Sequence, residues 1–495
     1  MANHEINAHI KHPAGLWYTA LSVAFYCFAF GGINSLLVLY ARDDLGITQH
    51  QVYTLFAAYN SLLFTLPLLG GFLSGKFGYK NAYGFGLLFC FLGCVTLAKI
   101  HSASGLYWGL ASFAVGVGLA GPSSYCLIGA LYAKQDARRE SGYTLFYMVF
   151  NIGFALSAII GGYASAHSYA SAFWIDAIGI LGAALTFFLF SSKIKSYEGE
   201  SMGIHSKLKF SGIMAVFACF SIVLLPLCDY LFQNPRANDL LLWALVIGSS
   251  LGLILLMLVQ HEKVAKQKIL AFLILSIISI AFWTLYALEP SLVTVFVGQH
   301  VERYGIPTAS FYSLNPIFII IFGLLFGWLW RHLNHKGKNL SLPTKFAASL
   351  FCVGSAFLIL YWCTVINKTV TTPTINPLWI VLAYMFFTIG ELLISPIGLS
   401  MVGRLAPAKK EGLLMGIWQL FTGFSAVVSG YAANMTTRNI PENSKAMIPL
   451  NIYQHSFFVI GVSTIAIGVV ACLLVPKIKK LLSNPQHLAA ANNDA

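Results

Sequence analysis

The chain has 495 residues, of which 58% are hydrophobic and only 9% are charged. Soluble globular proteins carry about 25% charged residues, so this composition excludes a water-soluble enzyme, which could not cover its surface with so few charges. A net charge of +13 would suggest nucleic-acid binding in a soluble protein. For a chain this apolar, the positions of the Lys and Arg residues show what the net positive charge indicates.

Fourteen apolar runs are long enough to cross a bilayer, which takes about 20 apolar residues. Backbone groups that face lipid must be satisfied within their own segment, so each run is predicted to be a helix. The fold class is therefore an all-α membrane protein. The runs are 14–40, 51–75, 81–98, 107–133, 143–165, 171–191, 210–232, 240–260, 269–296, 310–330, 346–365, 377–402, 412–434 and 452–476.

The 30 Lys and Arg residues are concentrated in every second loop, beginning with the segment before the first run. Arg138 and Arg139 lie on that side, whereas Arg42 is the sole basic residue of its loop on the other side. Loops rich in Lys and Arg remain in the cytoplasm, so both termini are predicted to be cytoplasmic. The positive charge reflects membrane topology, and no nucleic-acid partner is expected.

Motifs typical of enzymes and metal sites do not occur. The nine cysteines lie in or beside apolar runs, as small packing residues do, and no CxxC, HExxH, P-loop or GxSxG pattern is present. The spans hold only scattered acids, whereas catalysis needs a cluster of reactive groups. We therefore predict no enzyme activity, no metal and no cofactor.

The order of the runs indicates six spans, an inserted pair and six more. We expect an N-terminal six-helix bundle (1–191), a linker with an inserted transmembrane hairpin (192–265), a C-terminal six-helix bundle (266–480) and a disordered cytoplasmic tail (481–495). Two such bundles with a site at the membrane midplane are the plan of major facilitator transporters.

Three stretches go further: Asp136–Met148 (DARRESGYTLFYM), which leads to Asn151; Phe311–Pro316 (FYSLNP); and Gly390–Met401 (GELLISPIGLSM). Together they resemble the proton-dependent oligopeptide transporter family, and the inserted pair is similar to that of its bacterial members. The resemblance implies a monomeric symporter of di- and tripeptides in the bacterial inner membrane. A proton gradient would drive it, and two bundles would rock around a central site.

The chain departs from the family at charged positions. Alignment on Leu36–Tyr40 places Val23, Tyr26 and Cys27 at the charges of the family's ExxER motif, and Asn34 at a further arginine. The lysine of the fourth span corresponds to Gly121. We therefore expect the proton-linked and carboxylate-binding charges of the N-terminal half to be missing.

Four acids lie within the marked spans: Asp176, Asp229, Glu289 and Glu391. The resemblance implies that Glu391 binds the amino terminus of the substrate, with Ser395 one turn later on the same helix face. Burial without a cation favours a protonated carboxyl, so Glu391 is also a proton-coupling candidate. We expect Asp176 to reach the membrane interface in a structural role, and Asp229 to be interfacial.

Glu289 is the second proton-coupling candidate. It precedes Pro290, which frees carbonyls of the preceding turn and opens space for a polar group. The family's acid aligns with Ala287, and two helical residues rotate a side chain by about 200°. Proton coupling and packing are therefore both open for Glu289.

The remaining substrate-contacting predictions follow from the resemblance. Asn151 and Asn315 match substrate-contacting positions of the family, and their amides suit a peptide backbone, with interhelical bonding as the alternative. Asn34, Tyr147 and Trp418 complete the predicted set. The charges at 136–140 are expected to form either a gating salt bridge or a solvated loop.

Two functions stay open at this point. The first is a proton-coupled importer of di- and tripeptides. The second is a divergent carrier of an amine-bearing or carboxylate-lacking compound, with weak or altered proton coupling. A peptide carboxylate normally gains a charge-assisted bond worth about 1.5–3 kcal/mol, yet no Lys or Arg lies at mid-span. Both functions require only a small-molecule substrate, protons and the lipid bilayer as partners.

Overall fold

The computed structural model describes residues 11–133, 136, 138–195, 209–336, 338, 340–367, 375–406, 410–437 and 447–482. Within them, 14 helices are long and apolar enough to cross a membrane, which confirms the predicted number of spans. The only β-pairing in this part of the chain is an isolated bridge between Val301 and Ile375. The predicted tail from residue 483 onward and most of the predicted linker lie outside the described residues.

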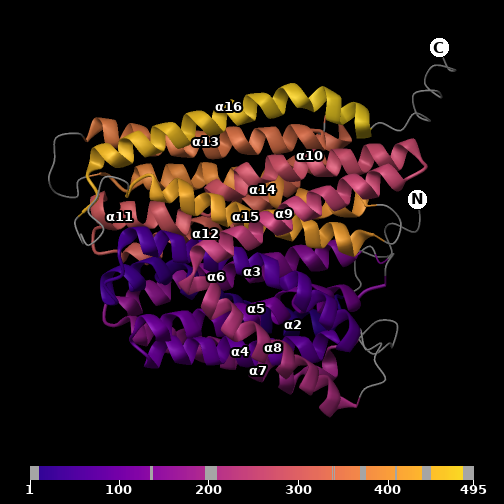
Figure 1. Cartoon of the computed structure of the whole chain (residues 1–495), viewed down its shortest axis with the longest axis horizontal. Helices are drawn as coiled ribbons and strands as arrows, with labels where there is room; N and C mark the ends of the chain where they lie inside the picture. The colour runs from indigo at the N-terminus through magenta and orange to yellow at the C-terminus, as the bar shows by residue number, and fades with distance from the viewer. Residues whose placement is uncertain are drawn as a thin grey trace. The chain divides into compact units, whose positions relative to one another are not determined.

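Figure 1 shows the helices coloured along the chain. The long helices are α2 (Ala14–Leu39), α3 (Gln49–Phe77), α4 (Tyr79–Lys99), α5 (Ala103–Ala130), α6 (Arg138–Ser165), α7 (Tyr169–Leu189), α8 (Phe210–Gln233), α9 (Pro235–Val259), α10 (Lys263–Tyr286), α12 (Leu314–His335), α13 (Leu342–Ile366), α14 (Leu378–Leu405), α15 (Glu411–Asn434) and α16 (Leu450–Leu482). Short elements are η2 (Tyr40–Asp44), η3 (Ser191–Lys193), η4 (Glu289–Val293), α11 (Thr294–His300) and η5 (Thr308–Ser313).

Residue contacts divide the chain into two units. Unit 1 comprises Met1–Ile47, Leu62–Asn234 and Gly305–Ile320. Its helix α4 packs closely on α5 because glycines line the contact. A Cβ added to Gly86 would lie 2.7 Å from the Gly116 carbonyl oxygen, and one added to Gly93 would lie 2.7 Å from the Gly109 carbonyl oxygen. Small residues of this kind let membrane helices associate without a hydrophobic driving force.

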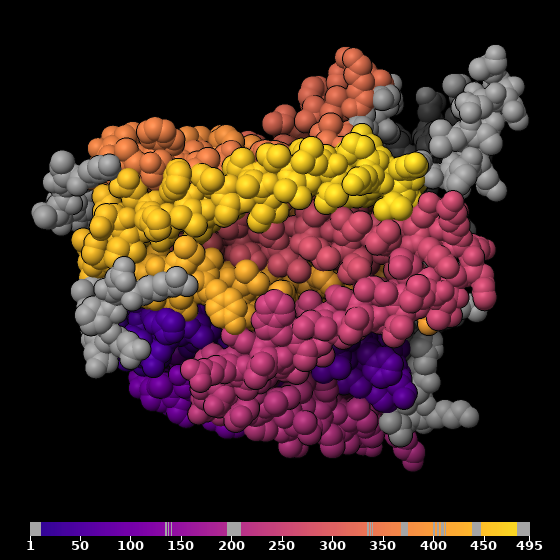
Figure 2. Space-filling view, turned by 45° about the horizontal axis from the view of Figure 1, so that its top comes forward, coloured from indigo at the N-terminus to yellow at the C-terminus, as the bar shows by residue number. Residues whose placement is uncertain are grey.

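Unit 2 comprises Thr48–Ser61, Pro235–Tyr304 and Ile321–Ala495. Here α13 packs against α16 and α14, and α10 packs against α15. Gly354 and Gly461 face each other between α13 and α16, which lie side by side in Figure 1. The outer side of α16, yellow in Figure 2, exposes Val469, Val470 and Leu473.

The two helices of the inserted pair belong to different units. In unit 1, Ile213 and Phe217 of α8 join a buried apolar cluster with Phe77, Ala82 and Leu119. The pair turns at Asn234, which separates α8 from α9 and ends the unit 1 segment. The two units are defined by which residues pack together, whereas the predicted bundles and hairpin are consecutive stretches of the chain. The predicted boundaries therefore stay a prediction.

Helix α9 is anchored within unit 2 by polar and aromatic contacts. Asn238 accepts a hydrogen bond from Ser61 Oγ at 3.2 Å, and Tyr431 donates one to Asp239. The Trp243 ring meets the Phe424 ring edge-on at 4.6 Å between centroids. The opposite side of α9 exposes Leu240, Leu251 and Leu255. Such apolar surface suits contact with lipid, as expected for a multi-pass membrane protein.

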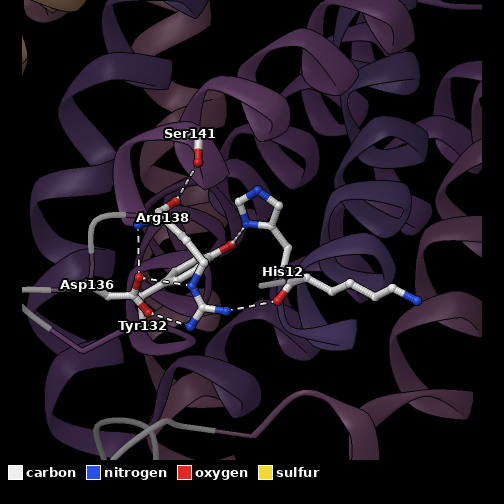
Figure 3. Close-up of polar contacts among 6 residues, drawn as sticks. His12, Tyr132, Asp136, Arg138 and Ser141 are labelled. Atoms are coloured by element: carbon white, nitrogen blue, oxygen red, sulfur yellow. Dashed lines mark hydrogen bonds and ion pairs between the residues drawn. The ribbon is translucent and has the colours of Figure 1, made fainter. Parts of the chain in front are cut away.

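The start of the described chain is tied to the connection between α5 and α6 (Figure 3). His12 Nδ1 lies 2.9 Å from the Tyr132 hydroxyl, and the Arg138 guanidinium donates a hydrogen bond to the Lys11 carbonyl at 2.8 Å. Arg138 also forms a 2.7 Å ion pair with Asp136. This connection therefore contains a partly buried ion pair whose partners both lie in unit 1, and its predicted role in gating stays a prediction. The side chain of Glu140 lies outside the described part.

The ion pair predicts a pH-dependent contribution to stability. Hydrogen bonds from Arg138 hold the pKa of the Asp136 carboxyl below its usual value. A lowered carboxyl pKa means that the pair stabilises the fold fully above about pH 4 and loses this effect as the pH falls through the lowered pKa. We expect Arg138→Gln to lower the unfolding free energy by about 0.2–1 kcal/mol at pH 7 and by much less at pH 3, measured by thermal unfolding in detergent. An equal loss at both pH values would contradict this assignment.

Candidate functional site

The span that carries Glu289 is not a continuous helix. Helix α10 ends at Tyr286, and a π-helical turn, η4, begins at Glu289 before α11 continues the span. Pro290 cannot donate a backbone hydrogen bond, so the helical ladder lacks one bond at this position. Hydroxyl groups satisfy carbonyls at the break: Ser291 Oγ donates to Ala287 at 2.9 Å, and Thr294 Oγ1 donates to Glu289 at 3.0 Å. The predicted space beside Pro290 stays a prediction.

Glu289 belongs to unit 2, and its carboxyl interacts electrostatically with that of Glu391 on α14. Glu289 is 0% exposed and Glu391 is 5% exposed. Within the described residues, neither carboxyl oxygen of Glu289 has a hydrogen-bond partner. A rotation of about 200° between Ala287 and Glu289 holds only for a regular α-helix. Because α10 ends at Tyr286 and a π-helical turn begins at Glu289, that rotation does not apply here. Two buried carboxyls that interact electrostatically cannot both ionise cheaply, so the pair can hold a proton.

Ser395 and Trp418 differ in burial. Ser395 is half-buried one turn after Glu391 and directly precedes the exposed Pro396 within α14. Trp418 of α15 is buried, its ring packs against Gly398, and its centroid lies 6.2 Å from that of Phe346. Trp418 thus has a clear packing role, and its predicted contact with substrate stays a prediction.

The predicted amides of unit 1 are buried in their helices. Asn34 donates to the Phe30 carbonyl at 2.9 Å, and Asn151 donates to the Tyr147 carbonyl at 2.8 Å. Both bonds run one turn back along the same helix, so they do not supply the interhelical bonding that was the alternative to substrate contact. An amide anchored in this way keeps its carbonyl oxygen and second N–H for other partners.

Tyr147 and Asn315 complete the unit 1 set. Tyr147 is half-buried, and its ring stacks on that of Phe150 at 6.0 Å between centroids. Asn315 is 3% exposed in the first turn of α12, directly after η5, which packs against α6. The predicted residues therefore fall into two sets: Asn34, Tyr147, Asn151 and Asn315 in unit 1, and Glu289, Glu391, Ser395 and Trp418 in unit 2. Their predicted roles stay predictions.

The positions aligned with the family's ExxER motif lie in an apolar core. Val23, Tyr26 and Cys27 are all less than 5% exposed. A Cβ added to Gly121 would lie 3.9 Å from the Tyr26 hydroxyl. Two positions that the alignment assigns to opposite charges thus lie close together, and this supports the alignment, although the loss of the motif remains an expectation.

The expectation that Asp176 reaches the membrane interface is wrong. Its side chain is 1% exposed, between α7 and α2. The pattern of α7 carries a signal for this burial. The helix buries residues at spacings of three, four, three and four: Phe173, Asp176, Ile180, Ala183 and Phe187. An acid within the apolar stripe of a helix faces the protein interior and not the interface.

Comparison with known proteins points to a single family of transporters. A family model described as the POT family matches residues 80–454. Dipeptide and tripeptide permease A of Erwinia pyrifoliae is 30% identical over 470 residues, covering 93% of this chain and 93% of the relative. Dipeptide and tripeptide permease B of Photorhabdus asymbiotica is 28% identical over 475 residues, covering 93% of this chain and 94% of the relative.

Solved structures show the same fold. A crystal structure of the peptide transporter POT in complex with sulfate superposes with a TM-score of 0.82 at 23% identity, covering 96% of this chain and 97% of that chain. A POT family transporter in complex with 5-aminolevulinic acid gives a TM-score of 0.81 at 21% identity, covering 95% and 98%. These likenesses confirm the predicted major facilitator fold. Because the family model spans most of the chain and a relative is 30% identical over nearly all of it, the chain belongs to the POT family, whose members are transporters and not enzymes.

Proposed function

We propose that the protein is a proton-coupled importer of di- and tripeptides that works by alternating access. The observation that carries the coupling is the buried pair of carboxyls, Glu289 and Glu391, in unit 2. The substrate class is supported by relatives named dipeptide and tripeptide permeases. These relatives do not favour the alternative of an amine-bearing, carboxylate-lacking substrate.

The pair suggests how substrate and proton are linked. In the empty carrier, one proton is shared by the two carboxyls. When the ammonium group of a peptide binds Glu391, it stabilises the ionised form of that carboxyl, and the proton then stays on Glu289. Release of the peptide removes this countercharge. The pair can therefore hold one proton, on Glu289, and the ammonium group of the substrate, on Glu391, at the same time.

The rest of the substrate would be held without a buried cation. Asn34, Asn151 and Asn315 offer amide groups to the peptide backbone and carboxylate, with Tyr147 on the unit 1 side. Ser395 and Trp418 would contribute from unit 2. We further propose a monomer in a bacterial inner membrane with both termini in the cytoplasm, driven by the proton gradient and requiring no other cofactor.

Replacement of Glu391 tests substrate binding. In proteoliposomes with an inward proton gradient, we expect Glu391→Gln to reduce dipeptide uptake by at least about 10-fold, because a charge-assisted bond of about 1.5–3 kcal/mol is lost. A dipeptide with an acetylated amino terminus should be transported poorly by the unaltered protein, since it has no ammonium group for Glu391. Gradient-independent uptake of a simple amine in preference to dipeptides would sink the proposed function.

Replacement of Glu289 tests proton coupling separately. We expect Glu289→Gln to abolish gradient-driven accumulation while exchange of internal for external dipeptide continues, because exchange needs no net proton movement. Glu302→Gln, the same substitution at an exposed acid of unit 2, is the matched control and should accumulate dipeptide normally. Accumulation that persists in Glu289→Gln would remove this residue from the coupling mechanism.

A further inference from the structure

The structure holds a third buried acid, which the mechanism proposed above does not use. Asp176 lies in α7, seven residues after Tyr169, or about 10 Å along the helix axis. Its side chain is 1% exposed, and neither carboxyl oxygen has a hydrogen-bond partner within the described residues. A buried polar group without a partner is rare in proteins, and each case calls for a physical explanation.

The surrounding helices leave a space shaped for this carboxyl. A Cβ added to Gly32 of α2 would overlap both oxygens and the carboxyl carbon of Asp176, so only glycine at this position leaves room for the acid. Helices α2 and α4 both pack against α7, and Cys94 of α4 interacts electrostatically with Asp176. The carboxyl is thus enclosed on three helices of a single unit.

Few other titratable groups on these helices interact with Asp176. Tyr26 of α2 interacts with Tyr83 and Cys90 of α4, and Cys90 in turn interacts with Cys94, the neighbour of Asp176. Lys99, at the end of α4, lies over the Trp174 ring at 5.8 Å. Tyr40, the first residue of η2, packs against Tyr169 and Phe173 of α7. Tyr163 of α6 is exposed. None of the ion pairs between described residues includes Asp176.

The chemistry of this space decides what it can bind. An ionised carboxylate without a partner is costly in an apolar interior, by several kcal/mol or more. The interhelical hydrogen bond that would explain a structural acid is not formed. The described residues also contain no group of three His, Cys, Asp or Glu side chains that could hold a metal ion. The neighbours of the Asp176 carboxyl are Gly32 and the thiol of Cys94. A proton is the one ligand that a single carboxyl can bind without further ligating groups.

We propose that Asp176 is a second proton-binding site of the carrier, located in unit 1 and independent of the Glu289–Glu391 pair. Its part in transport rests on the proposed function, because a proton must move during the cycle for the site to matter. Proton binding itself does not depend on the identity of the substrate.

Infrared spectroscopy of the full chain in lipid tests proton binding directly. The carbonyl-stretch band of a protonated carboxyl should be present at neutral pH, and Asp176→Asn should remove one component of it. Asp229→Asn is the matched control, because Asp229 is an acid of α8 whose carboxyl accepts a hydrogen bond from Gln233 at 2.7 Å. Asp176→Asn should also keep its unfolding temperature, since an amide matches a neutral acid in size. An infrared band that is unchanged in Asp176→Asn would overturn the proposal.

Transport stoichiometry tests the role of the site. We expect the number of protons moved per dipeptide to fall by one in Asp176→Asn, measured from proton and peptide fluxes in the same vesicles. Glu289→Gln should leave the Asp176 infrared component in place. If dipeptides prove not to be substrates, the proposed function fails while the infrared result still stands. An unchanged stoichiometry in Asp176→Asn, with uptake intact, would overturn the role of Asp176 in coupling.

Discussion

The cost of an uncompensated charge in an apolar interior constrains every polar feature of this protein. Basic residues are kept to the loops and helix ends, and no Lys or Arg lies at mid-span. The acids that remain inside are few, and each has a defined setting: Glu289 beside Glu391, and Asp176 against Gly32. Since the carboxyl oxygens of Asp176 and Glu289 have no hydrogen-bond partner among the described residues, the proton is the species that can neutralise these two acids.

Backbone geometry makes these settings available. Glu289 lies at the interruption after Tyr286 within unit 2, and hydroxyl groups of Ser291 and Thr294 satisfy carbonyls there. Glycines have the corresponding role elsewhere, since Gly32 leaves room for Asp176 and Gly86 and Gly93 let α4 approach α5. A polar group can persist at membrane depth only where the backbone around it provides both space and satisfied hydrogen bonds.

The inserted helix pair is also informative about organisation. Its first helix shares a core with α3, α4 and α5 in unit 1, whereas its second is bonded to residues of α3 and α15 in unit 2. The sequence predicts such a hairpin from two extra apolar runs. The sequence does not show which helices these two pack against, because their residues are apolar on nearly all sides.

The sequence alone was sufficient for the membrane class, the fourteen spans and the family. These depend on run length, composition and local motifs, which do not change on folding. Tertiary structure alone decided that Glu289 meets Glu391, that Asn34 and Asn151 bond within their own helices, and that Asp176 is buried. Each of these depends on where a helix breaks, how it is rotated and which neighbour it packs against. For Asp176 the spacing of α7 held the information, but distance from the span end was the wrong guide to its depth.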